Sequence, residues 1–140
     1  MNTTITREDD APAADAEVVG NGLDAFNLSH TGDDHYQRIR LFVRDDDRAI
    51  LGGLLGYVYL DWMFVQILWL DERLRGGGTG AELMRRAEEA ARELGCTGVW
   101  LDTFSFQAPG FYRKLGYEEF GRLDDYPRGF SRHFLRKLLG

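Results

Sequence analysis

The sequence of 140 residues is poor in the residues on which several classes of protein depend. It contains one cysteine, Cys96, which excludes an intrachain disulfide framework and is typical of a reducing compartment. No group of histidine, cysteine, aspartate and glutamate has the spacing of metal ligands, so we predict no metal site. The N-terminus has no basic segment followed by an apolar stretch, so we expect no secretory signal and a cytoplasmic location.

Basic residues are outnumbered, 17 against 23 acidic ones, and the formal net charge is -6. The excess of acid lies in residues 1–47, where 11 acidic side chains accompany 4 basic ones. A basic stripe supplies most of the affinity of proteins for nucleic acid, and this chain has none. We therefore predict no DNA or RNA partner, while a polyanion the size of a nucleotide stays compatible with the charge.

An uninterrupted hydrophobic run of membrane-spanning length is also missing. Residues 49–70 are the most apolar region, but they contain three glycines, Asp61 and Gln66. An uncompensated aspartate near the centre of a span costs about 2.5–3.5 kcal/mol on insertion scales. We interpret this region as two buried strands joined by a turn at Asp61-Trp62, and we predict no association with a membrane.

What remains is the composition of a folded protein, with 44% hydrophobic and 29% charged residues in a length suited to one domain. Residues 1–14 are polar and aperiodic, which predicts a flexible tail before a single domain at 15–140. The patterns of apolar residues predict strands at 38–44, 50–60, 63–70, 98–104, 117–123 and 130–138. They predict helices at 20–31 and 109–115. A third, longer helix is predicted to follow the glycines near residue 78 and to stop at Gly95.

This order of elements predicts an α/β fold with a mixed, mostly antiparallel central sheet of about six to seven strands and flanking helices. In the long helix after the glycines, the charged residues are expected to face water, Glu88 among them.

The strongest chemical signal is the loop Arg75-Gly76-Gly77-Gly78-Thr79-Gly80. Glycines let backbone N–H groups approach a ligand, and the helix that follows directs its unpaired N–H groups to the same place. Arg75 can add a charge-assisted hydrogen bond. The loop therefore predicts a binding site for a diphosphate.

The loop has three other interpretations. A phosphate-binding P-loop is excluded because Gly80 is followed by Ala81 and a glutamate instead of lysine and serine or threonine. A dinucleotide fingerprint fits loosely through Gly76, Gly78 and Ala81, with Asp102 about 20 residues further on. A plain turn from strand to helix would need one glycine, whereas this loop has four.

Two segments carry a resemblance to a known family. Residues 68–80 (LWLDERLRGGGTG) are similar to the acetyl-CoA-binding motif of the GNAT superfamily of N-acetyltransferases, and residues 108–117 (APGFYRKLGY) resemble its second motif. The resemblance extends over Met63 to Phe120, about two fifths of the chain. The order and separation of the two segments make the resemblance specific.

The resemblance implies acetyl-CoA as cosubstrate and a GNAT-like sheet. It implies that the pantetheine arm pairs with the end of the strand before the loop and that the loop amides hold the pyrophosphate. Ser105 stands where many members have an asparagine, so the sequence departs from the family pattern at a pantetheine contact, and Gln107 is a hypothetical substitute. The implied cofactor-binding residues are Leu68, Trp69, Leu70, Arg75, Gly76, Gly77, Gly78, Thr79, Gly80, Ala81, Ser105 and Lys114.

The resemblance further implies that Tyr112 protonates the leaving thiolate, a role suited to a phenol with a pKa near 10. The alternative for Tyr112 is an aromatic residue of the core. Asp61 lies within a residue of a glutamate found in some relatives and is the first candidate for the general base, although it also suits a hairpin turn. Asp102 is the second candidate. The three histidines are expected to be structural or exposed, His133 among them.

The predicted function is acetyl-CoA-dependent N-acetyltransferase activity on a primary amine of a small molecule, by direct attack on the thioester. The alternative is a non-catalytic acyl-CoA-binding module, and a homodimer is possible because many relatives form one. The substrate pocket is expected where residues 20–31, the Asp61-Trp62 turn and residues 124–129 converge. Its expected aromatic walls are Trp62, Phe64, Phe106 and Tyr126.

Overall fold

The structure, a computed structural model, describes residues 1–140 and divides the chain into two compact units, Met1–Asp34 and His35–Gly140. The first unit contains helix α1 (Ala13–Thr31), which ends at Gly32. The predicted helix is confirmed, but it begins at Ala13 instead of Gly20, because the preceding residues are rich in alanine and favour a helix. No helix of the structure has the length and apolar character needed to cross a membrane.

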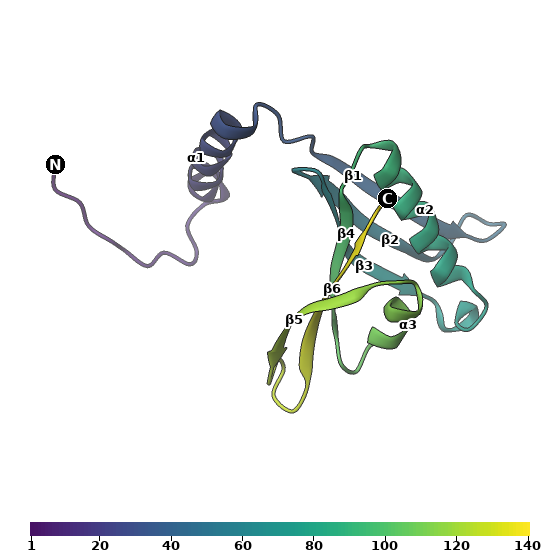
Figure 1. Ribbon diagram of the computed structural model, residues 1–140. Coiled ribbons are helices and arrows are strands. Elements are labelled where there is room, and N and C mark those ends of the chain that lie inside the picture. Colours follow the sequence, from purple (N-terminus) through teal and green to yellow (C-terminus); the bar gives the residue numbers. More distant parts are fainter. The chain divides into compact units, whose positions relative to one another are not determined.

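The second unit is built on a six-stranded sheet in the order β1-β2-β3-β4-β6-β5 (Figure 1). Neighbouring strands are antiparallel except β3 and β4, which are parallel. The predicted fold class is confirmed, and every strand boundary lies within one residue of its prediction. The strands are β1 (Gln37–Arg44), β2 (Ile50–Tyr59), β3 (Trp62–Leu70), β4 (Gly98–Phe104), β5 (Glu118–Asp124) and β6 (Ser131–Leu138).

Helix α2 (Thr79–Glu93) supplies the connection from β3 to β4 and packs its apolar stripe against the sheet. A single turn of 3-10 helix, η1 (Glu72–Leu74), precedes it, and the short helix α3 (Pro109–Lys114) follows β4. The buried apolar core is Ile39, Leu54, Val58, Met63, Val65, Leu83, Met84, Ala87, Ala91, Cys96, Val99, Leu101, Tyr117 and Leu135.

One residue of α2, Glu88, does not lie on the water-facing side of the helix as predicted. This side chain is buried instead of facing water. Its carboxylate accepts a hydrogen bond from the hydroxyl of Tyr117 at 2.9 Å and one from the ammonium of Lys137 at 2.8 Å. The two donors satisfy the carboxylate and make its burial possible.

The turn between β2 and β3 is formed by Leu60 and Asp61, both with positive φ. Tyr59 pairs directly with Trp62, so the predicted turn at Asp61-Trp62 is displaced by one residue. Two left-handed residues match the twist of a two-residue hairpin, which explains how nonglycine residues hold this conformation. Asp61 therefore lies at the start of β3, and its carbonyl accepts a hydrogen bond from the N–H of Thr97 at 2.8 Å.

The parallel strands β3 and β4 part before either ends. They pair from Trp62 with Gly98 to Val65 with Leu101, and no pairs follow. At the same level β3 bulges against β2, because Leu55 pairs with Ile67 and Gly56 with Val65, which leaves Gln66 without a partner. A bulge bends its strand and increases the local twist. The last residues of β3 thus keep one edge free of strand pairing.

Candidate active site

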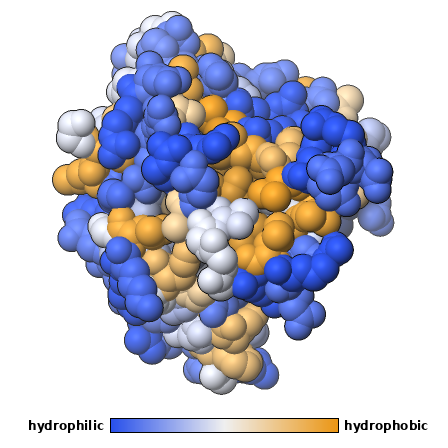
Figure 2. Space-filling model, turned by 90° about the vertical axis from the view of Figure 1, so that its right-hand side faces the viewer, coloured by the Kyte–Doolittle hydropathy of each residue, from blue (hydrophilic) through white to orange (hydrophobic).

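A pocket of about 820 Å³ lies where β3 and β4 part. Three segments form it: the second half of β3, the glycine loop with the first turn of α2, and the stretch from the end of β4 to α3. Figure 2 shows a face of the molecule on which hydrophobic residues gather in a hollow among hydrophilic ones. The lining residues are Val65, Gln66, Ile67, Leu68, Leu70, Leu74, Arg75, Gly76, Gly78, Gly80, Ala81, Asp102, Thr103, Phe106, Gln107, Ala108, Phe111 and Tyr112.

Asp71 holds the start of the loop. Its carboxylate accepts a hydrogen bond from the backbone N–H of Arg73 at 2.9 Å and forms an ion pair with the guanidinium of the same residue. The hydrogen bonds from Arg73 lower the pKa of Asp71 to about 2, so the carboxylate is charged at neutral pH. Arg75 then folds back, and its Nε donates to the carbonyl oxygen of Leu70 at 3.3 Å.

Two glycines of the loop have backbone conformations that other residue types rarely adopt. Gly76 has φ of +78° and Gly78 has φ of +86°, in the left-handed region that favours glycine. Gly78 is the N-cap of α2, so the N–H groups of the first turn after it have no acceptor within the helix. These N–H groups and the helix dipole favour an anion beside the pocket.

Glu82 does not oppose that anion, although it lies in the first turn of α2. Its carboxylate binds Arg85 at 2.7 Å and Arg86 at 2.9 Å. Hydrogen bonds from these two residues, Arg85 first, lower the pKa of Glu82 to about 2. The negative charge of Glu82 is therefore balanced by two arginines of the same helix.

Tyr112 reaches the pocket from α3. Its ring meets the ring of Phe111 edge to face, with 5.0 Å between the centroids. Burial, together with the negative charge of Asp102, raises the pKa of Tyr112 to about 12. The phenol is therefore protonated at neutral pH and can donate a hydrogen bond or a proton within the pocket.

Asp102 reaches the pocket from β4 and is largely buried. Its carboxylate binds the guanidinium of Arg132 at 2.7 Å, and Arg132 also donates to the hydroxyl of Tyr126 at 3.0 Å. The charge of Asp102 also contributes to the raised pKa of Tyr112. A carboxylate and a protonated phenol therefore belong to residues that line the same pocket.

Gln107 lines the pocket, whereas Ser105 does not. The Gln107 side-chain oxygen accepts hydrogen bonds from the backbone N–H of Phe104 at 2.8 Å and from the hydroxyl of Thr103 at 3.1 Å. Ser105 turns to β6, where its hydroxyl accepts from the N–H of Ser131 at 3.0 Å. The segment after β4 is thus fixed by two polar residues, one of which lines the pocket.

Several residues expected at the site from the sequence lie outside the pocket. Asp61 is in the β2–β3 turn at the opposite end of β3. Three predicted residues of β3 and the glycine loop do not line the pocket: Trp69, Gly77 and Thr79. Lys114, at the end of α3, is exposed and does not line it either. The lining residues that were not among the predicted site residues include Gln66, Thr103 and Phe111, the last of which lies within the second motif.

Of the four expected aromatic walls, Phe106 lines the pocket. Phe64 stacks on Trp100 instead, with 4.2 Å between their centroids, and Trp62 lies at the paired start of β3 beside Gly98. All lining residues belong to the unit His35–Gly140.

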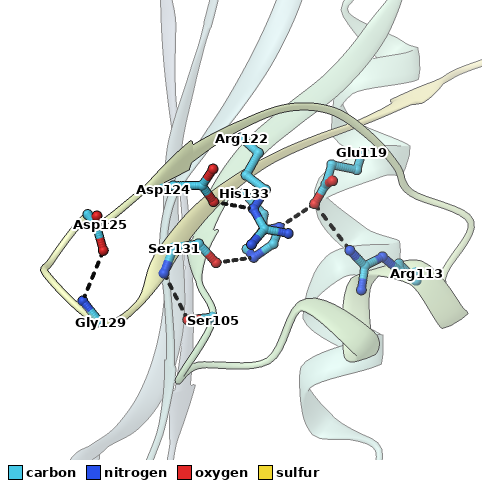
Figure 3. Close-up of polar contacts among 9 residues, drawn as sticks. All are labelled: Ser105, Arg113, Glu119, Arg122, Asp124, Asp125, Gly129, Ser131 and His133. Carbon is cyan, nitrogen blue, oxygen red and sulfur yellow. Dashed lines mark hydrogen bonds and ion pairs between the residues drawn. The ribbon is translucent and has the colours of Figure 1, made fainter.

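A second polar cluster links the paired strands β5 and β6 to α3. Figure 3 shows His133 between Ser131 and Glu119, with Arg113 of α3 on the far side of the glutamate. The Nε2 of His133 lies 2.8 Å from the Ser131 hydroxyl, Nδ1 contacts the Glu119 carboxylate, and Arg113 donates to the same carboxylate at 3.2 Å. Ser131 and His133 are buried and do not line the active-site pocket, and the contact of Arg113 with Glu119 joins α3 to the sheet.

Replacing His133 by leucine is expected to lower the free energy of unfolding by about 1–3 kcal/mol, because the buried Ser131 hydroxyl and the Glu119 carboxylate each lose a partner. Urea unfolding measures the change. Arg122→Ala is the matched control, since it removes the exposed ion pair with Asp124 in the same hairpin and should change stability by less than about 0.5 kcal/mol. Equal effects of the two substitutions would contradict a structural role for His133.

Comparison with known proteins shows the family. Residues 9–117 match the model of the acetyltransferase (GNAT) family. The chain is 46% identical over 91 residues to blasticidin-S acetyltransferase of Streptomyces morookaense, a match that covers 64% of this chain and 67% of the relative. It is 34% identical to an acetyltransferase of Agrobacterium fabrum over 98% of both chains.

Solved structures agree with these relatives. The crystal structure of an acetyltransferase from Bacillus cereus superposes with a TM-score of 0.86 and 34% sequence identity, covering 96% of this chain and 98% of that one. Acetyl-CoA is the acetyl donor of the family. The chain therefore belongs to the GNAT family and is an acetyltransferase that uses acetyl-CoA.

Proposed function

We propose that this acetyltransferase transfers the acetyl group to a primary amine of a small molecule, by direct attack of the amine on the thioester. The observation that carries the proposal is the meeting of three features in one pocket: the glycine loop, the protonated phenol of Tyr112 and the carboxylate of Asp102. Together they can bind an anionic donor and handle the protons of an amine acylation.

The chain's own groups suit the donor. The amides at the start of α2 and the guanidinium of Arg75 would hold the pyrophosphate. The unpaired edge of β3 at residues 68–70 would accept the amides of the pantetheine arm, as it would a neighbouring strand. Acetyl-CoA supplies the acetyl group as an activated thioester.

Tyr112 and Asp102 divide the proton transfers. As the bond from nitrogen to the acetyl carbon forms and the carbon–sulfur bond breaks, Tyr112 gives its proton to the leaving sulfur. Asp102 takes the proton lost by the amine, directly or through a water molecule, and the phenol recovers its proton from the solvent or from that carboxylate. We prefer Asp102 to Asp61 as the base because Asp102 lines the pocket.

Two observations support a small acceptor. The pocket has a volume of about 820 Å³, which must hold the reactive end of the donor as well as the acceptor. One relative is named for the acetylation of blasticidin S. We infer an acceptor of comparable class, a small molecule with a free amine.

Release of free thiol from acetyl-CoA, followed with a thiol reagent, tests this function. The panel comprises amino acids, polyamines, aminoglycosides, blasticidin S and a lysine peptide. Turnover of one class of small amine would support the proposal; preferred turnover of the peptide would overturn the small-molecule part. Tight binding of acetyl-CoA without turnover of any amine would favour a binding module. Light scattering on the same samples tests the homodimer, which should have twice the mass of one chain.

A further inference from the structure

Four aromatic rings form a continuous cluster beside the mouth of the active-site pocket. Phe104 and Phe106 stack in parallel, with centroids 5.3 Å apart and 4° between their planes. Phe130 meets Phe106 edge to face at 5.1 Å, and Tyr126 contacts Phe104 at 5.7 Å. Phe104 ends β4, Phe106 follows in the segment before α3, and the other two rings belong to the loop between β5 and β6; the pairing of β4 with β6 brings these segments together at one end of the sheet.

The cluster is open to solvent. Phe106 is 56% exposed, Phe130 48% and Tyr126 44%. Neighbouring aromatic rings that stay this exposed on a soluble protein mark a binding surface, because water contact with their faces is unfavourable. Tyrosine and phenylalanine are also among the residues enriched where ligands and partners bind.

The cluster continues into the catalytic pocket. Phe106 lines the pocket together with Asp102 and Tyr112. The guanidinium of Arg132 lies over the rings of Phe104 and Tyr126, at 5.4 and 5.1 Å from their centroids, while it binds the Asp102 carboxylate. The positive charge beside the rings is thus balanced, so the surface offers flat apolar faces instead of a site for an anion.

We propose that this aromatic cluster is the acceptor subsite and that it binds amines attached to a flat aromatic or heteroaromatic ring. The ring of the acceptor stacks on Phe106, and its side chain carries the amine into the pocket toward Asp102 and Tyr112. The inference rests on the proposed function, since it names the class of amine that the same site accepts. Stacking of one additional ring favours binding by about three- to tenfold over a ring without π electrons.

Two amines with the same chain and different rings test the proposal. In 2-phenylethylamine and 2-cyclohexylethylamine the same aminoethyl chain carries an aromatic or a saturated ring. Calorimetric titration into the protein saturated with coenzyme A gives the Kd of each amine without need of turnover. We expect the aromatic amine to bind about three- to tenfold more tightly, and Phe106→Leu to remove that preference by weakening the aromatic amine more than the saturated one.

Phe120→Leu is the matched control. Phe120 is an equally exposed ring on β5, packed near Phe134, and it does not line the pocket. This variant should keep the preference. Equal affinities of wild type for the two amines, or an equal loss of both in Phe106→Leu, would overturn the subsite.

The same titrations separate this inference from the proposed function. Selective binding without thiol release from acetyl-CoA would uphold the subsite and contradict the acetylation of such amines. Light scattering decides whether a second copy of the chain covers the cluster: a dimer of wild type that Phe106→Leu converts to monomer would also overturn the subsite.

Discussion

Replacing Tyr112 by phenylalanine is expected to lower kcat by about 10²–10⁴-fold, the usual contribution of a positioned general acid or base. The substitution removes one hydroxyl and keeps the ring that packs on Phe111. Binding of acetyl-CoA should therefore change little, and the loss should appear in kcat. Steady-state thiol release at saturating donor measures it.

Tyr59→Phe is a suitable control, because it removes a phenolic hydroxyl that lies outside the pocket, at the far end of β2. The pH profile gives a second check. Since the pKa of Tyr112 is raised to about 12, its phenol stays protonated at alkaline pH, and kcat should not fall between about pH 8 and pH 10. An alkaline decrease centred below pH 10, or a kcat of Tyr112→Phe close to that of wild type, would argue against this residue as the acid.

Replacing Gly78 by valine is expected to weaken acetyl-CoA binding by about tenfold or more. A β-branched residue is strained at φ of +86°, and a left-handed L-residue costs roughly 1–2 kcal/mol. The backbone can relieve this strain by turning the amides at the start of α2 away from the donor. Calorimetric titration with acetyl-CoA gives the Kd.

Gly78→Asn is the control for the valine variant, because it places a different side chain at the same position. Asparagine tolerates the left-handed region better than valine, and nothing lies within 4 Å of the position where its Cβ would be. Its effect on the Kd should therefore be clearly smaller than that of valine. If the two variants bind equally well, or if valine leaves the Kd unchanged, the conformation of Gly78 does not determine donor binding.

The fold could be predicted because each element carries its own local signal. The strands are short apolar or alternating runs bounded by turns, and their boundaries lie within one residue of the prediction. The glycine loop was recognisable for the same reason, since Gly76 and Gly78 hold the positive φ that their type suggests. Residue type and spacing were sufficient wherever the cause lies within a few residues.

The features that could not be predicted depend on partners far away in the sequence. Glu88 is buried because Tyr117 and Lys137, 29 and 49 residues further on, satisfy its carboxylate. Asp102 owes its place beside Arg132 to the pairing of β4 with β6, 30 residues apart. Periodicity along one helix contains no information about such partners, so it assigned Glu88 to water. Asp61 was placed before Asp102 for another reason, its position within a residue of a glutamate found in some relatives.

The parting of β3 and β4 also has a mechanical consequence. Four residue pairs, from Trp62 with Gly98 to Val65 with Leu101, join the strands β1–β3 to the strands β4–β6. These pairs lie at one end of both strands, and beyond them each strand continues separately into one wall of the pocket. A small rotation about this seam changes the width of the pocket most at the glycine loop and least at Val65.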